Sequence, residues 1–280
     1  MVQPTTAPWE KIAEDMRTQV TKWHISAWKL YTVWGPNGKG WWLTDEVGRK
    51  TIEHGLSLGV PLIAVHKGLP LPGMDPNYTL ASDVGPIARA FPKATFLIYH
   101  SGFEPEVLEG PYNPKAERGI DVLIRSLQEN GIGAGGNVYA ELGSTWREVM
   151  KKPNEAAHVI GKLLKFFGED RILWGTDAIW FGSPQDQIQA FRAFEITPEF
   201  QERYGYPALT SERKAKIFGL NAARIYAVDL GELKKAQRDD WVNRVRTEYA
   251  NAPRPSFQTY GPRTRRDLLR LMSFRRGMPD

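Results

Sequence analysis

The sequence predicts an α/β fold with a parallel sheet, and three observations support this prediction. Five short segments rich in apolar and β-forming residues recur along the chain, separated by segments of helical periodicity. Most of these segments are nearly continuous in apolar residues, as strands buried on both faces are. Alternation of strand and helix is the pattern of parallel α/β sheets. We therefore expect an incomplete TIM-like (β/α) barrel, with about five of the eight strands that a closed barrel has.

Each expected element has a local signal. Proline lies near the start of the first helix, Thr44 is placed to cap the second helix, and Gly59 is placed to end it. The strands are expected at residues 24–32, 61–66, 94–100, 137–142 and 171–177. The helices are expected at residues 8–22, 44–59, 83–92, 116–131, 144–151, 154–168, 184–195 and 210–226. Long loops follow the second and third strands, and such loops in compact domains are usually functional.

Residues 1–230 are expected to form this partial barrel domain, and residues 231–280 a basic helical extension around its outside or toward a partner. Between Arg263 and Asp280 there are six arginines and two aspartates, a surplus of four within a net charge of +5. The body is therefore close to neutral and lacks the basic stripe that is typical of nucleic-acid enzymes. We expect no nucleic-acid partner, and a binding module based on the basic tail is the weakest alternative.

The amino-acid composition narrows the possible kinds of metal site and the possible cellular locations. The chain has no cysteine, so any metal must be held by imidazole and carboxylate groups. No segment approaches the roughly 18 apolar residues of a membrane span, and the first residues lack the apolar core of a secretory signal. We expect a cytoplasmic protein with no membrane partner, and a homodimer is left open. Ten tryptophans suggest a pocket or an interface with aromatic walls.

Three of the expected strands lead to a residue that can bind a metal or carry a proton, namely His66, His100 and Asp177. Strand carboxyl ends converge on one face of such a barrel, where catalytic residues lie. A neutral imidazole can bind zinc, and a histidine can also act as acid or base near neutral pH. Each residue has a structural alternative: a buried histidine bonded to a carbonyl group, or an aspartate that caps a helix. Three such residues on three strands favour a metal-dependent active site.

Other candidates for the substrate pocket have weaker signals. Lys29 lies near the end of the first strand, where it could meet a substrate carboxylate, or could equally extend into solvent. Glu141 ends the fourth strand, and Trp180 follows Asp177 by three residues. We expect Glu141 to lie in the pocket and Trp180 to form an aromatic wall, with core packing as the alternative for Trp180.

The segments AVHKG, LIYHSG, ILWGTDAIW and IFGLNAARIYAVD resemble the C-terminal two-thirds of the amidohydrolase family 2 domain. That family includes enzymes similar to aminocarboxymuconate-semialdehyde decarboxylase, and the resemblance runs from about residue 8 to residue 230. It implies a metal-dependent barrel in which His66 and Asp177 are metal ligands. It also implies that Asp177 can serve as base, and that His100 faces the metal-bound water or substrate as an acid or base.

The sequence also departs from that family, which has two further ligands in a His-x-His pair on its first strand. The five histidines are His24, His54, His66, His100 and His158, and no two of them are two residues apart. The resemblance begins after what would be the third strand of the barrel. We therefore expect an N-terminally truncated form of a longer protein, or one half of a split one, with truncation the favoured interpretation.

The resemblance implies a hydrolase that uses a divalent metal, expected to be Zn²⁺, to activate water against a C–N, ester or lactone bond. The expected substrate is a small molecule that contains a ring. The same residues would serve non-oxidative decarboxylation of an unsaturated or aromatic carboxylic acid, which is the first alternative. An alternative of another class is a non-catalytic fragment or subunit whose barrel is completed by a partner chain.

Overall fold

The five strands form one parallel sheet. The structure is a computed structural model that describes residues 1–35, 39–238, 240–253 and 261–275. The strands are β1 (Trp28–Leu30), β2 (Leu62–His66), β3 (Thr95–Tyr99), β4 (Val138–Glu141) and β5 (Ile172–Leu173). Their order in the sheet is β1-β2-β3-β4-β5, so each strand lies beside its neighbours in the sequence. This uninterrupted order is that of a singly wound TIM-like barrel, and the predicted α/β fold class is confirmed.

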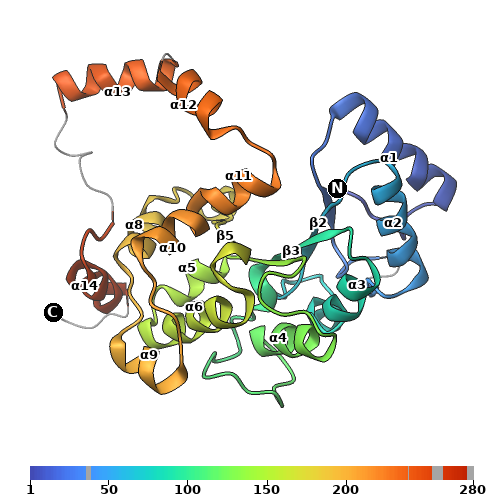
Figure 1. The fold of residues 1–280 in the computed structure, drawn as a ribbon, viewed down its shortest axis with the longest axis horizontal. Helices are drawn as coiled ribbons and strands as arrows, with labels where there is room; N and C mark the ends of the chain where they lie inside the picture. The colour runs from blue at the N-terminus through green and yellow to red at the C-terminus, as the bar shows by residue number, and fades with distance from the viewer. Residues whose placement is uncertain (36–38, 239, 254–260, 276–280) are drawn as a thin grey trace.

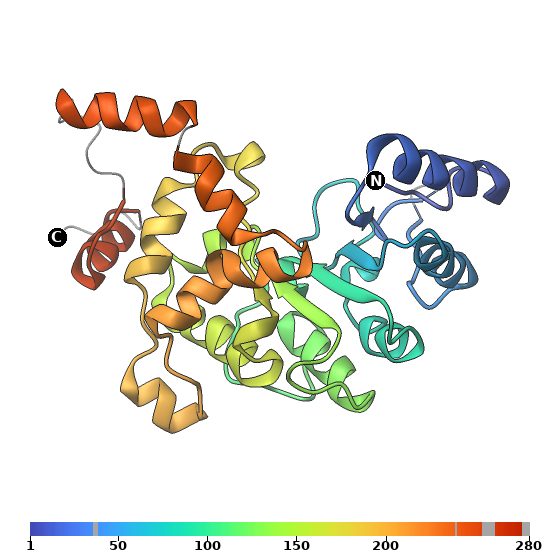
Figure 2. The same ribbon diagram turned by 45° about the horizontal axis from the view of Figure 1, so that its top comes forward.

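Helices connect and surround the strands (Figure 1). Those between the strands are α1 (Trp9–Trp23), α2 (Glu46–Ser57), α3 (Val84–Ala90), α4 (Ile120–Glu129), α5 (Thr145–Val149) and α6 (Pro153–Phe167). Those after β5 are α7 (Ala178–Phe181), α8 (Gln185–Ala193), α9 (Pro198–Tyr204), α10 (Ser211–Ala215), α11 (Asn221–Ile225), α12 (Leu230–Arg238), α13 (Trp241–Asn251) and α14 (Arg265–Arg275). Helices α1 and α2 lie at one end of the molecule, and α8, α9 and α14 lie at the other (Figure 2).

The main hydrophobic core lies between one face of the sheet and the helices that cover it. Right-handed connections between neighbouring parallel strands place all of these helices on the same face. Ile63, Phe96 and Ile98 point to that face and pack in one cluster with side chains of α3, α4 and α6. The opposite face carries a separate small cluster of Ala64, Leu97, Tyr139 and Leu173. This second face is the one that looks into the interior of a barrel.

Strand register decides which side chains share the inner face. Lys29 pairs with Ala64, and Ala64 pairs with Leu97, so these three lie in one row across the sheet. Because side chains alternate along a strand, the residues two positions further on lie on the same face, nearer the carboxyl ends. His66 pairs with Tyr99 in this next row, and Glu141 ends the neighbouring strand β4. The register thus places Lys29, His66 and Glu141 on the inner face.

Several expected boundaries were wrong. The strand expected at 24–32 is only Trp28–Leu30, because His24 instead ends α1 in a left-handed conformation (φ 48°). The strand expected at 171–177 is only Ile172–Leu173, and the chain turns toward the pocket after it. The helix expected at 210–226 is divided by a π-helical turn at Lys216–Leu220. The short helices α7 and α9 were not predicted, because they are too short to show a period.

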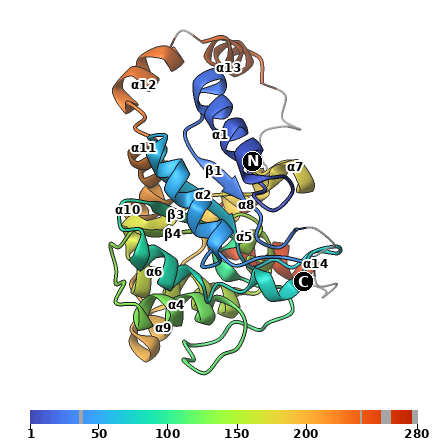
Figure 3. The same ribbon diagram turned by 90° about the vertical axis from the view of Figure 1, so that its right-hand side faces the viewer.

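The C-terminal segment forms helices, but parts of the predicted 231–280 extension lie outside the described residues, namely 239, 254–260 and 276–280. In α14, Leu268 and Met272 are buried in the main core, and this helix packs against α8. Helices α12 and α13 lie at one extremity, away from α4, α6 and α9 (Figure 3). In the described part of the chain, no helix is both long and apolar enough to cross a membrane.

Candidate active site

A cavity of about 690 Å³ opens at the carboxyl edge of the sheet. His66, His100 and Asp177 all lie in its lining, so the structure brings together the three strand-end residues that the sequence singled out. Lys29 and Trp180 also line it. The loop after β2 adds the apolar side chains Leu69, Leu71, Pro72 and Met74, and the loop after β3 adds Pro105. A cavity of this size and mixed character is typical of small-molecule sites.

A buried ion pair fixes the loop after β2. Lys67 is fully buried, and its Nζ donates to Oδ2 of Asp83 at 2.9 Å and to the carbonyl oxygen of Tyr78 at 3.1 Å. Oδ2 of Asp83 also accepts from the backbone N–H of Leu43. These bonds hold both ends of the loop against the rest of the domain. The apolar side chains of the loop are thereby kept beside the cavity.

The two histidines form a continuous hydrogen-bonded chain. Nδ1 of His100 lies 2.7 Å from the carbonyl oxygen of Gly143, which only accepts, so Nδ1 of His100 carries the hydrogen. In the neutral ring Nε2 of His100 is then an acceptor, and it lies 3.1 Å from Nδ1 of His66. Nε2 of His66 lies 3.2 Å from the carbonyl oxygen of Leu69, which also only accepts, so the single hydrogen of a neutral His66 can serve only one of its two contacts.

Burial keeps both rings neutral at physiological pH. Desolvation, together with the neighbouring His100 and Lys29, lowers the pKa of His66 to about 2, although the contact with the Leu69 carbonyl oxygen opposes the shift. Desolvation also lowers the pKa of His100 to about 4, although the hydrogen bond to Gly143 and the charge of Asp177 oppose the shift. Both imidazoles are therefore neutral at rest, and neither holds an extra proton at neutral pH.

Asp177 completes the cluster from the turn after β5. Its Oδ2 accepts a hydrogen bond from Oγ of Ser144 at 2.6 Å and lies 3.6 Å from Nδ1 of His100. Ser144 is buried, whereas Asp177 is partly exposed to the cavity. The hydroxyl of Ser144 and the ring of His100 thus hold one side of the Asp177 carboxylate. The rest of this carboxylate faces the cavity.

The backbone at the site is unusual. His100, Ser101, Ser144 and Asp177 all have positive φ values, between 50° and 67°. Residues other than glycine rarely adopt this left-handed region, and such strain concentrates at functional sites. Here the left-handed turns direct the side chains of His100, Ser144 and Asp177 toward one another directly after the ends of β3, β4 and β5.

Lys29 projects into the cavity from β1 on the inner face. Its Nζ lies 3.5 Å from the ring centre of Tyr99 and 4.9 Å from that of Tyr31. Desolvation lowers the pKa of Lys29 to about 7, although the carboxylates of Glu141 and Asp177 oppose the shift. The lysine is therefore a cavity group and does not extend to the outer surface.

Glu141 lies behind His100 and is not on the cavity wall. Its carboxylate accepts backbone N–H groups from Gly143 at 2.8 Å and from His100 at 3.3 Å. It packs so closely on Gly175 that a Cβ atom at that glycine would overlap Oε1 of Glu141. Burial raises the pKa of Glu141 to about 7. Through these contacts, Glu141 positions the turns that carry His100 and Asp177.

The aromatic walls come from several segments. Trp180 is 78% exposed and stands at the rim of the cavity, so it is no core residue. Tyr31 and Trp34 form a second wall: their rings stack at 4.9 Å between centres, and Tyr31 also stacks on His66 at 5.4 Å. Sequence reasoning missed Tyr31, Trp34 and Ser144. Tyr31 follows Lys29 by two residues, so the alternation of side chains along a strand could have placed it on the same face. Ser144 follows β4, so the convergence of strand carboxyl ends could have placed it at the site.

The described donors do not by themselves fit a closed metal site. In the described part of the chain, no group of three or more histidine, aspartate or glutamate side chains is placed to hold one ion. His66 and Asp177 are chemically suitable ligands, but a catalytic zinc ion normally has three from the protein. Both ring nitrogens of His66 already contact other groups, Nδ1 with His100 and Nε2 with the carbonyl oxygen of Leu69.

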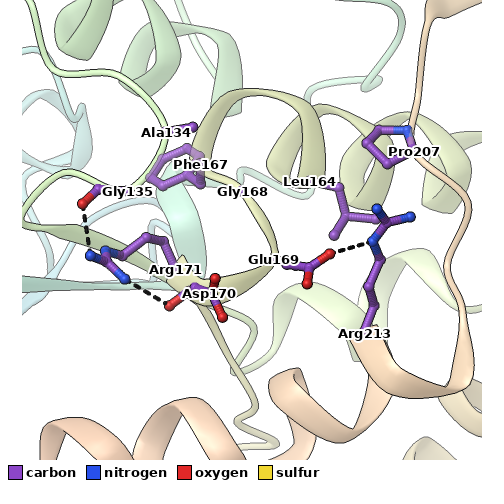
Figure 4. A pocket seen from close by; sticks show the side chains of 10 residues that line it. All are labelled: Ala134, Gly135, Leu164, Phe167, Gly168, Glu169, Asp170, Arg171, Pro207 and Arg213. Atoms are coloured by element: carbon purple, nitrogen blue, oxygen red, sulfur yellow. Dashed lines mark hydrogen bonds and ion pairs between the residues drawn. The ribbon is translucent and has the colours of Figure 1, made fainter.

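A second cavity, of about 430 Å³, lies at the amino edge of the sheet beside β5 (Figure 4). Its charged side chains are already engaged: Arg171 donates to the carbonyl oxygens of Gly135 and Gly136, and Arg213 donates to Glu169. Lys216 makes further ion pairs with Glu169 and Asp170. This end of a barrel usually serves stability, and we assign the cavity no chemistry.

The fold and the site together define the class of protein. A singly wound parallel sheet with histidine, aspartate and serine gathered at the carboxyl ends of its strands is the arrangement of (β/α)-barrel enzymes. The sequence matches the amidohydrolase family over residues 2–228, and the chain belongs to that family. The resemblance drawn from the strand-end motifs is thereby confirmed.

Several solved structures are similar in fold at low sequence identity. They include 2,6-dihydroxybenzoate decarboxylase from Rhizobium, at 15% identity and a TM-score of 0.46, covering 79% of this chain and 68% of that one. An uncharacterised TIM-barrel protein from Bordetella bronchiseptica has 17% identity and a TM-score of 0.49, covering 79% of this chain and 64% of that one. A 4-oxalomesaconate hydratase from Rhodopseudomonas palustris has 16% identity and a TM-score of 0.43, covering 84% of this chain and 66% of that one. No curated protein matches the sequence.

Proposed function

We propose that this chain is a hydrolase of the amidohydrolase type that acts on a C–N, ester or lactone bond of a small, ring-containing substrate. The observation that carries the proposal is the convergence of His66, His100, Ser144 and Asp177 at one cavity. Membership of the amidohydrolase family supports the class of enzyme. The aromatic walls support a substrate with a ring.

In this proposal Asp177 is the general base. Its carboxylate faces the cavity, and the bond from Ser144 fixes its orientation. A water molecule beside it would lose a proton to the carboxylate as its oxygen attacks the carbonyl carbon of the substrate. Nδ1 of His100 lies 3.6 Å from the same carboxylate oxygen, so the imidazole can stabilise the charge that develops while Asp177 returns the proton to the leaving group.

The same residues support a second candidate, the non-oxidative decarboxylation of an unsaturated or aromatic acid. The cation of Lys29 in the cavity favours it, because a substrate with a carboxylate would find a partner there. The two candidates differ in their products. Hydrolysis releases an acid together with an amine or an alcohol, or opens a lactone ring, whereas decarboxylation releases carbon dioxide.

A product assay on the purified chain tests this proposal. We expect released acid from a panel of cyclic amides, esters and lactones, and no release of carbon dioxide from the corresponding ring acids. Carbon dioxide without acid release would favour the decarboxylase. Absence of both products, with the chain folded by circular dichroism, would contradict catalysis by this chain and favour a subunit that needs a partner.

The proposed cofactor is a divalent metal, with Zn²⁺ best suited to one imidazole and one carboxylate donor. We expect the purified chain to bind zinc in competition with a weak chelator, and the variants His66→Ala and Asp177→Ala to lose that binding. His54→Ala is the matched control, because His54 contacts the backbone of Ala13 far from the cavity. Equal zinc binding in all variants, or none in the unaltered chain, would contradict this part of the proposal.

A further inference from the structure

Lys29 is a basic group of the cavity that takes no part in the proposed acid–base chemistry. It projects from β1 into the cavity lining, and its Nζ lies over the rings of Tyr99 and Tyr31. Among the described residues, no oxygen accepts a hydrogen bond from Nζ, and the charges of Glu141 and Asp177 act on it only at a distance. The amine is therefore held in place by ring faces and not by an acceptor.

The fully buried lysines of the described chain, Lys67 and Lys162, are arranged differently. Nζ of Lys67 donates to Asp83 at 2.9 Å, and Nζ of Lys162 lies 2.6 Å from a carboxylate oxygen of Asp121. Direct pairing of this kind is the usual requirement for burying an ammonium group. Lys29 lacks it, so desolvation acts on this lysine without a direct counter-charge.

This arrangement favours the neutral amine form of Lys29. Desolvation lowers its pKa to about 7, although the charges of Glu141 and Asp177 oppose the shift. A substantial share of the side chain is therefore neutral at pH 7, and a neutral amine carries a nucleophilic lone pair. The ring faces of Tyr99 and Tyr31 can accept N–H groups but donate none, so they leave this lone pair available.

The surroundings of Nζ suit an electrophile without charge. Leu69, Leu71 and Met74 give the cavity an apolar wall. When Lys29 is neutral, the carboxylate of Asp177 in the same lining disfavours an anionic ligand. A neutral aldehyde or ketone avoids that repulsion, offers an electrophilic carbonyl carbon to the amine, and places its hydrocarbon part against the apolar side chains.

We propose that Lys29 is a nucleophile that forms an imine with the carbonyl carbon of a neutral aldehyde or ketone held in this cavity. The amine lone pair forms the C–N bond as the carbonyl π electrons move to oxygen. That oxygen leaves as water with the two hydrogens that the nitrogen loses, so no oxidant or reductant is consumed. Asp177 lines the same cavity and can carry these protons from nitrogen to oxygen. The reaction goes beyond the proposed hydrolysis, in which Lys29 forms no covalent bond.

Reductive trapping on the full chain tests the proposal. The probe is cyclohexanone, and sodium cyanoborohydride at pH 7 reduces the imine to a stable amine that peptide mapping by mass spectrometry locates. We expect Lys29 to be modified at least about tenfold faster than an exposed lysine, because a larger share of the buried amine is neutral. Lys22 is the matched comparison in the same digest, because it also lies over an aromatic ring, that of Trp23, but on the exposed surface of α1.

Variants and unfolding connect this reactivity to the folded cavity. Lys29→Met should remove the fast single adduct from the mass of the intact chain, whereas Lys22→Met should retain it. Unfolding in urea should bring the rates at Lys29 and Lys22 together, since the preference depends on burial. Equal rates in the folded chain, or a preference for Lys29 that persists in urea, would overturn the proposal. Because trapping needs no hydrolytic turnover, a chain that fails the product assay but keeps the preference would contradict the proposed function and leave this inference standing.

Discussion

Replacing His100 with asparagine is expected to lower the turnover rate by about 10²- to 10⁴-fold, the usual contribution of a positioned acid–base group. Asparagine can still donate to the carbonyl oxygen of Gly143, so the turn after β3 should be retained. It cannot act as an acid or a base beside Asp177. The expected loss is therefore in kcat rather than in KM, and steady-state kinetics on a substrate from the product assay measures it.

His54→Asn is the control for this prediction. His54 is half-buried and its Nε2 contacts the carbonyl oxygen of Ala13, so the change removes a histidine outside the cavity lining. Its kcat should stay within a few-fold of that of the unaltered chain. A His100→Asn variant with normal kcat would show that His100 has only a structural role.

The Lys162→Met variant is expected to lose about 3–5 kcal/mol of folding free energy, the usual cost of breaking a buried ion pair. Nζ of Lys162 is fully buried, 2.5 Å from Oε2 of Glu109 and 2.6 Å from Oδ1 of Asp121. Without the lysine, two buried carboxylates lose their counter-charge. Burial already raises the pKa of Glu109 even with Lys162 present. Urea denaturation followed by circular dichroism measures the change.

Lys235→Met is the matched control, because Lys235 pairs with Glu232 on the surface, with both side chains about 70% exposed. Pairs of this kind contribute about 0.2–1 kcal/mol, so this variant should be close to the unaltered chain. The variant Lys162→Met/Glu109→Gln/Asp121→Asn should recover part of the loss, because it removes the unpaired charges. Equal stability of Lys162→Met and Lys235→Met would contradict the importance of the buried network.

The sequence was sufficient to predict the parallel sheet and the main catalytic candidates. Continuous apolar strands alternating with helical periods define a singly wound α/β fold, and the carboxyl ends of such strands converge. His66, His100 and Asp177 were therefore expected to meet, and they do. Lys29 could be placed by the alternation of side chains along β1.

Other features depend on contacts that no local pattern encodes. The wall of Tyr31 and Trp34 forms because the chain bends after β1, and the bond from Ser144 to Asp177 needs left-handed turns at both residues. Glu141 was expected in the cavity, because it ends a strand. The close approach of Gly175 instead leaves its carboxylate behind His100, on backbone N–H groups.

His66, the proposed metal ligand, shows the same limit. Sequence spacing cannot reveal that both ring nitrogens of His66 already contact other groups, Nδ1 with His100 and Nε2 with the carbonyl oxygen of Leu69. If His66 held a metal through Nε2, its contact with Leu69 would be lost, so the loop that carries Leu69 would also be involved.

The central claim is that His100 and Asp177 act as one acid–base unit, and a double-mutant cycle on kcat tests it most directly. Residues that act as a unit are strongly non-additive, so the second substitution costs little once the first is made. We predict that His100→Asn/Asp177→Asn retains about the activity of the less active single variant. A double variant whose loss equals the product of the two single losses would show that the residues act independently and would contradict the account.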